Sequence, residues 1–175
     1  MSVSVQEADF DVGAEIAALT AGNADAGAVA SFVGMVRGGE GSTPPRSETQ
    51  LAAPHGGANA TLERSGDGIT AMTLEHYPGM TERALEDIVA QARGRWDLLG
   101  VRVIHRVGRL LPGERIVFVG VASSHRHDAF AACEFIMDYL KTQAPFWKNE
   151  ETPSGGHWVD ARESDDAALS RWRND

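Results

Sequence analysis

The chain has little cysteine and little lysine. One of its 175 residues is a cysteine, Cys133, and only Lys141 and Lys148 among its 16 basic residues are lysines. A lone cysteine excludes an internal disulfide framework and a zinc site built from several cysteines, and it fits a reducing compartment. The net charge is −9. Because phosphate backbones are bound by concentrated positive charge, general nucleic-acid binding is excluded, and any bound anion needs a local basic pocket.

Long apolar runs are also missing. No segment approaches the roughly 18 apolar residues of a membrane span, and the opening MSVSVQEADFDVGAE is acidic where a secretion signal is basic and then apolar. Hydrophobic residues make up 42% and charged residues 23%, as in a globular domain. We therefore expect a soluble, cytoplasmic protein.

The scarcity of lysine indicates a use for the two that are present. Arginine keeps its proton in proteins, whereas burial or neighbouring charge can shift lysine toward a neutral amine. In a chain that otherwise uses arginine, Lys141 and Lys148 therefore point to positions where the amine itself is needed. Chance retention of two surface lysines is the alternative.

The segment from Gly38 to Gly68 differs from the rest of the chain. Its 31 residues include seven glycines, three prolines and no aromatic residue. Such a composition buries too little apolar surface to offset the entropy of ordering the chain. We predict one domain over residues 1–175 with a flexible insertion at 38–68.

Strands and helices alternate in the remaining sequence. Apolar and β-branched runs predict strands at 28–36, 69–77, 101–107 and 116–121, with a last short strand at 157–162. Within Val101–Val107, residues of one face alternate with arginines, which is the pattern of a half-buried strand. Helices are predicted after Thr81, read as an N-cap, and after Ser123 or Ser124, with Pro145 ending the second; an acidic helix closes the chain. The fold class is α+β with a mainly antiparallel sheet, and a parallel pair stays possible.

The second predicted helix is flanked by the densest polar groups. Its apolar face is expected to hold Phe130, Cys133, Ile136, Met137 and Leu140. A buried thiol in that stripe is favoured over a nucleophile or a metal ligand with His125 and His127. His125 and Arg126 at the helix start suit a bound phosphate, although Ser124 acting only as a cap remains the alternative.

Five runs of the sequence resemble one known family. They are SFVGMVR at 31–37, MTLEHYPGMTERALEDIVAQAR at 72–93, VIHRVGRLLPGERIVFVGVASSHR at 103–126, FIMDYLKTQAPFW at 135–147 and HWVDARESD at 157–165. Together they are similar to the large, catalytic subunit of molybdopterin synthase. The resemblance implies an α/β-hammerhead-like fold with an added β subdomain, and a homodimer within a heterotetramer.

The resemblance also implies a reaction. Family members are sulfurtransferases that convert cyclic pyranopterin monophosphate, a pterin phosphate, to molybdopterin in molybdenum cofactor biosynthesis. Sulfur comes from the C-terminal Gly-Gly thiocarboxylate of a small ubiquitin-like sulfur-carrier subunit. Because that thiocarboxylate is the nucleophile, no metal or cofactor is expected. A non-catalytic receptor for the tail, or a phosphate-ester hydrolase using His125, are the alternatives.

Carried over to this chain, the family's site gives two groups of residues. Lys141 and Lys148 are the expected catalytic residues. The expected substrate-binding residues are these two lysines together with Phe32, Met35, Val36, Arg37, His125, Arg126, Met137, Asn149, Glu150 and Arg162. The chain departs from the family at Met35, where the family carries lysine, and in the length of the 38–68 insertion.

Overall fold

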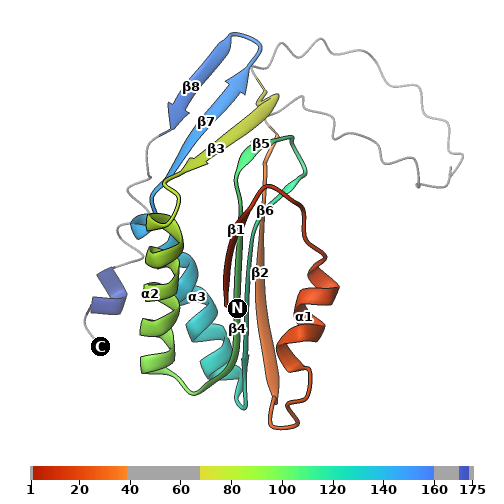
Figure 1. Ribbon diagram of the computed structural model, residues 1–175, viewed down its shortest axis with the longest axis vertical. Coiled ribbons are helices and arrows are strands. Elements are labelled where there is room, and N and C mark those ends of the chain that lie inside the picture. The colour runs from red at the N-terminus through yellow and green to blue at the C-terminus, as the bar shows by residue number, and fades with distance from the viewer. Residues whose placement is uncertain (1, 39–67, 160–169, 174–175) are drawn as a thin grey trace, which may run out of the picture.

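The computed structural model describes residues 2–38, 68–159 and 170–173, which form two sheets and three α-helices (Figure 1). Most of the 38–68 insertion, Arg162 and the predicted closing acidic helix up to residue 169 lie outside these ranges. The elements are β1 (Val3–Gln6), α1 (Val12–Thr20), β2 (Ala28–Met35), β3 (Ala71–His76), α2 (Met80–Arg95), β4 (Leu98–Arg106), β5 (Gly108–Leu110), β6 (Arg115–Ser123), α3 (Arg126–Gln143), β7 (Phe146–Thr152), β8 (Gly155–Val159) and a 3-10 turn (Arg171–Arg173). No described helix is long and apolar enough to cross a membrane.

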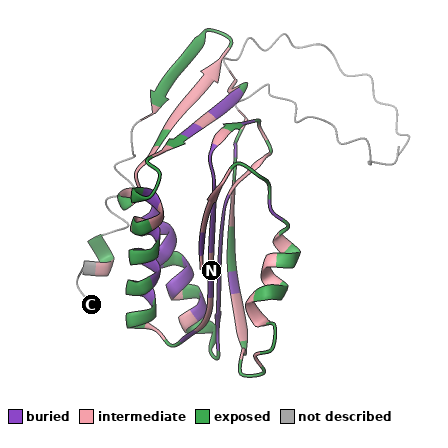
Figure 2. Cartoon of the chain, viewed as in Figure 1, coloured by how far each residue is buried: buried purple, intermediate pink, exposed green. Residues whose placement is uncertain are grey.

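The first sheet has the strand order β1-β4-β6-β2. β1 and β4 are parallel, and the other neighbours are antiparallel. Helices α2 and α3 cover one face and α1 covers the other (Figure 1). The predicted central strand is β6, whose valines pack toward α2 and α3 while Phe118 packs toward α1. Burial is therefore concentrated along β4, β6 and the inner sides of α2 and α3 (Figure 2).

The strand predicted at 101–107 is confirmed as part of β4, but it is buried on both faces and not on one. In β4, Ile104 is fully buried beneath α1, and Arg106 is buried as well. The Arg106 guanidinium donates from Nε to the Glu7 carbonyl and from Nη1 to the Arg115 carbonyl, each at 3.0 Å. An arginine whose donors are satisfied in this way can lie inside a sheet, so the polar positions did not mark a solvent face.

The second sheet has the order β5-β3-β7-β8 and is antiparallel throughout. It lies beyond one end of the first sheet (Figure 1). Its inner side forms a small core in which Met72, Leu74 and Leu110 pack with Val36, which follows β2. The last strand is Gly155–Val159 within the described residues, against the predicted 157–162. The mixed, mainly antiparallel α+β fold is confirmed.

Both helix caps differ from the predicted ones. α2 begins after Gly79, whose φ of 80° suits glycine, while Thr81 is buried in the first turn. α3 begins after His125, and the Ser123 hydroxyl donates to the Asp97 carbonyl at 2.9 Å. Each hydroxyl stabilises a contact between elements and does not cap the helix. Phe130, predicted in the apolar face of α3, is 67% exposed.

Candidate functional site

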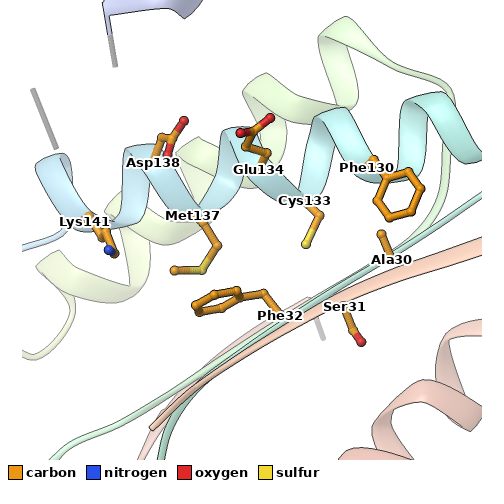
Figure 3. A pocket seen from close by; sticks show the side chains of 9 residues that line it. All are labelled: Ala30, Ser31, Phe32, Phe130, Cys133, Glu134, Met137, Asp138 and Lys141. Atoms are coloured by element: carbon orange, nitrogen blue, oxygen red, sulfur yellow. The ribbon is translucent and has the colours of Figure 1, made fainter. Parts of the chain in front are cut away.

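An open pocket of about 370 Å³ lies between α3 and β2. We call it the α3–β2 pocket; it is lined by Ala30, Ser31, Phe32, Phe130, Cys133, Glu134, Met137, Asp138 and Lys141 (Figure 3). Met137 and Lys141 are one helical turn apart and line the same pocket, as the i, i+4 spacing predicts. Phe32 rises from β2 to face Met137 (Figure 3). The pocket therefore combines apolar walls with one amine.

The two acids along this stretch of α3 are engaged by one arginine. Arg171 Nη2 lies 2.7 Å from Glu134 Oε1 and 2.8 Å from Asp138 Oδ2. These hydrogen bonds, to Asp138 first and then to Glu134, raise the pKa of Arg171. Both carboxylates point away from β2 (Figure 3). The negative charge on this part of α3 is therefore partly balanced outside the pocket, whose β2 side holds Lys141.

Lys148 lies on the inner side of the second sheet. It is paired in register with Leu74, and directly paired residues project from the same face of a sheet. Its Nζ lies 2.8 Å from Glu150 Oε1, and both side chains are mostly buried, with 31% and 16% exposed. Because Leu74 packs against Val36, this face meets the end of β2, beside the exposed side chains of Met35 and Arg37. The structure thus places Lys148 and Glu150 on the face of the second sheet that packs with Val36, the residue between Met35 and Arg37.

Three expected site residues lie elsewhere in the single chain. Asn149 alternates with Lys148 and Glu150 along β7, so it projects from the opposite face of the second sheet. His125 and Arg126 are exposed at the start of α3. Arg126 is separated from Lys141 by 15 residues of continuous helix, which is about 22 Å at 1.5 Å per residue. One copy of the chain therefore does not bring His125 and Arg126 to Lys141.

Cys133 forms part of the pocket wall but is not exposed as a nucleophile. The side chain is buried, and burial raises the pKa of its thiol to about 11, with the charge of Glu134 as a smaller cause. A thiol with this pKa is almost entirely protonated at neutral pH and reacts slowly. Among the described residues, no group of three or more His, Cys, Asp or Glu could hold a metal ion.

Alkylation of the native protein should therefore leave Cys133 unmodified. With excess iodoacetamide at pH 7.5, roughly a hundred-fold slower reaction than that of the unfolded chain is expected, because burial limits both thiolate and access. Intact mass measured over time provides the rate, and the chain in denaturant provides the reference. Rapid modification of the folded protein would contradict the buried placement of this thiol.

A buried histidine connects the two sheets. The sequence pattern predicted only that this residue occupies an alternating position in a strand, and it indicated no function for it. His105 in β4 stacks on Phe146, the first residue of β7, with ring centroids 3.7 Å apart and an interplanar angle of 16°. Its Nδ1 lies 2.8 Å from the Arg106 carbonyl oxygen, which accepts a hydrogen bond from the Nδ1–H. Burial lowers the pKa of His105 to about 4, with a smaller contribution from His76.

The stability of the fold should therefore decrease as the pH falls from 6.5 to 4. In that range the unfolded chain protonates His105 while the folded chain does not, so protons favour unfolding. The lowering from 6.5 to about 4 corresponds to roughly 3 kcal/mol of unfolding free energy, fully present above pH 6.5. Urea titrations at several pH values should show this slope, and His105→Phe should flatten it.

The effect of Asp9 on stability occurs in a lower pH range than the effect of His105. The hydrogen bond from Arg115 lowers the pKa of Asp9 from 3.8 to about 2. The stabilisation from Asp9 is therefore lost below pH 3.8 and leaves the range above pH 4 unaffected. An equal slope in wild type and His105→Phe between pH 6.5 and 4 would contradict the assignment to His105.

Comparisons with known proteins identify the family. The family model described as "MoaE protein" matches residues 5–143. The chain is 54% identical over 171 residues to the molybdopterin synthase catalytic subunit of Ralstonia nicotianae, covering 98% of this chain and 84% of that protein. It is 49% identical to the same-named protein of Pseudomonas aeruginosa, covering 98% and 99%.

Solved structures show the same fold. The molybdopterin biosynthesis MoaE protein from Burkholderia ambifaria matches with a TM-score of 0.73 at 50% identity, covering 98% of this chain and 97% of that one. A more distant match, at 17% identity and a TM-score of 0.64, is in the protein–protein complex of subunits 1 and 2 of molybdopterin-converting factor from Helicobacter pylori. That match supports the fold alone.

Proposed function

Because the chain belongs to the MoaE protein family, we propose that it is the catalytic subunit of a molybdopterin synthase. The proposed reaction is the conversion of cyclic pyranopterin monophosphate to molybdopterin in the cytoplasm, with sulfur taken from the C-terminal thiocarboxylate of a small ubiquitin-like subunit. The observation that carries this proposal is the α3–β2 pocket, where Lys141 lies beside the apolar side chains of Phe32 and Met137.

The residue types in the pocket suit this chemistry. The sulfur of the thiocarboxylate is itself the nucleophile, so the chain has to bind, orient and transfer protons. An amine such as that of Lys141 can donate a proton or stabilise developing negative charge as the carbon–sulfur bond forms. Lys148, held by Glu150, is assigned to holding the anionic thiocarboxylate tail in position for attack. Arg37, His125 and Arg126 are assigned to the phosphate, through charge-assisted hydrogen bonds.

The separation along α3 supports a homodimer. Lys141 and Arg126 lie at opposite ends of this helix, so a complete pocket needs Arg126 and His125 from a second copy. In a twofold-symmetric pair the two α3 helices can lie antiparallel, with the start of one beside the end of the other. The free edge of β2, with Phe32 42% and Met35 55% exposed, offers the apolar surface for such a pair.

The assembly can be measured directly. Light scattering of the isolated chain at micromolar concentration should give twice the chain mass of 18.7 kDa. Addition of the small subunit should give a heterotetramer with two copies of each chain. A stable monomer would contradict the shared pocket.

The function is tested by reconstitution. Purified chain, thiocarboxylated small subunit and the cyclic pterin phosphate should yield the dithiolene product, and the carboxylate form of the small subunit should yield none. Tail binding without turnover would instead indicate a non-catalytic receptor. Phosphate release without a sulfur donor would indicate a hydrolase using His125.

A further inference from the structure

The turn between α3 and β7 separates the two lysines and is held from two sides. Lys141 lies in the last turn of α3, and Lys148 is the third residue of β7. Between them, the Pro145 carbonyl oxygen accepts a hydrogen bond from the buried Thr81 hydroxyl at 3.3 Å. Phe146, which follows directly, stacks on His105. These two contacts connect the turn to α2 and to the first sheet.

The His105 ring is fixed more firmly than the Phe146 ring that it contacts. It is 5% exposed, and its strand is paired on both sides, with Val5 on β1 and Val117 on β6 at this position. The hydrogen bond from Nδ1 to the Arg106 carbonyl adds a constraint on the ring plane. Phe146 is only partly buried, so the stack orients Phe146 more than the reverse.

The position of Phe146 affects Lys148 because both project from one face of β7. Alternation along a strand places residues i and i+2 on the same side, about 6.6 to 6.8 Å apart. The pairing of Phe146 with His76 and of Lys148 with Leu74 confirms that face. A shift at the first residue of β7 therefore moves Lys148 relative to Lys141.

We propose that His105 is a positioning residue, which, through its stack on Phe146, fixes the start of β7 and with it the placement of Lys148 relative to Lys141. The proposal rests on the proposed function for its kinetic readout. Reacting groups lose about 100-fold in rate when displaced by about 1 Å, so a small shift at this turn has a measurable effect. His105 itself touches no substrate in this scheme.

Kinetics of four variants test the stack. Leucine is similar in volume to the side chain that it replaces in Phe146→Leu and His105→Leu, but it has no flat ring. Each substitution therefore removes one ring of the stack. Each is expected to lower kcat about tenfold, with KM for the pterin changed less than twofold, since binding groups remain. Because both changes break the same contact, the double variant should be no slower than the slower single variant. Phe146→Tyr keeps the ring, and its hydroxyl can reach solvent, so it should keep more than half of kcat.

A matched control separates positioning from loss of stability. Phe10 and Phe118 form another aromatic pair, with centroids 6.0 Å apart, on the α1 side of the first sheet. Phe10→Leu should lower the melting temperature to a similar extent and leave kcat per folded molecule unchanged. Wild-type kcat in both Phe146→Leu and His105→Leu, or equal losses in Phe10→Leu, would overturn the proposal.

The scarcity of lysine offers a readout that does not depend on activity. Protein labelled with ¹⁵N-lysine gives two backbone amide signals, which Lys148→Arg assigns. In Phe146→Leu and His105→Leu the Lys148 signal should shift, while Phe10→Leu should leave it in place. An unmoved Lys148 signal contradicts the positioning role. If wild type yields no dithiolene product but Lys148 shifts as expected, the proposed function fails while the structural coupling stands.

Discussion

Replacement of Lys141 by arginine is expected to lower single-turnover product formation about 100-fold or more, the scale of acid–base and electrostatic catalysis. Lys141 is the one basic residue that lines the described α3–β2 pocket, facing Phe32 and Met137. Arginine keeps the positive charge but neither releases a proton near neutral pH nor presents a compact amine. Rapid-quench measurement with saturating thiocarboxylated small subunit reports the chemical step itself.

Two further variants make the test of Lys141 sharper. Lys148→Arg should be less severe, because its assigned role is to bind an anion, which a guanidinium also does. Lys141→Ala should regain part of its rate with added ethylamine, while equal concentrations of guanidinium should restore none. Partner binding and the melting temperature should match wild type in Lys141→Arg and Lys141→Ala, since Lys141 is exposed. Near wild-type rates in Lys141→Arg would show that a fixed charge suffices.

Apolar patterns predicted the parts of the fold that packing determines. The β6 strand has an almost unbroken apolar run, and the stripe of Leu85, Ile88, Val89 and Ala92 in α2 is buried as its spacing indicates. α1 was missed although Asp11 caps it with a 2.7 Å hydrogen bond to the Ala14 amide. None of its residues is fully buried, so the apolar contrast along this nine-residue helix is weak.

β7 could not be predicted from the residues that compose it. Five of its seven residues are polar, and its pairing depends on β3, which lies about 70 residues earlier in the chain. The same long-range pairing determines which side of the strand Lys148 occupies. Local sequence therefore placed Lys141 beside Met137 correctly, because both lie on one helix, but it gave no information about the surroundings of Lys148.

The length of α3 has a consequence for the site. The resemblance assigns residues from both ends of this helix to one pocket and does not show how far apart they lie. A helix that starts at Arg126 and ends before Pro145 separates His125 and Arg126 from Lys141 by most of its length. Residues about 22 Å apart on one rigid element cannot bind one small substrate together. A pocket that uses both ends of α3 therefore requires two copies of the chain.

Purified heterodimers of two inactive variants should regain about half of wild-type activity if each pocket is shared between chains. One chain carries Lys141→Ala, and the other carries His125→Ala with Arg126→Ala. Each variant alone damages both pockets of its homodimer. In the heterodimer both defects fall in one pocket, and the other pocket is intact, because Lys141 comes from one chain and Arg126 from its partner. Two different affinity tags, used in succession, isolate the heterodimer for the pterin conversion assay.

The matched control uses two residues that lie on either side of one turn of the same chain. Lys141 and Lys148 flank a single turn of one chain, so a heterodimer of Lys141→Ala with Lys148→Ala has one defect in each pocket. That heterodimer should show no more activity than the mean of its two parent homodimers. Recovery of activity in this control would contradict the shared pocket. A lack of recovery when Lys141→Ala is combined with the His125 and Arg126 double variant would contradict it as well. The shared pocket predicts recovery in the first pairing alone, since only there does one pocket retain every residue.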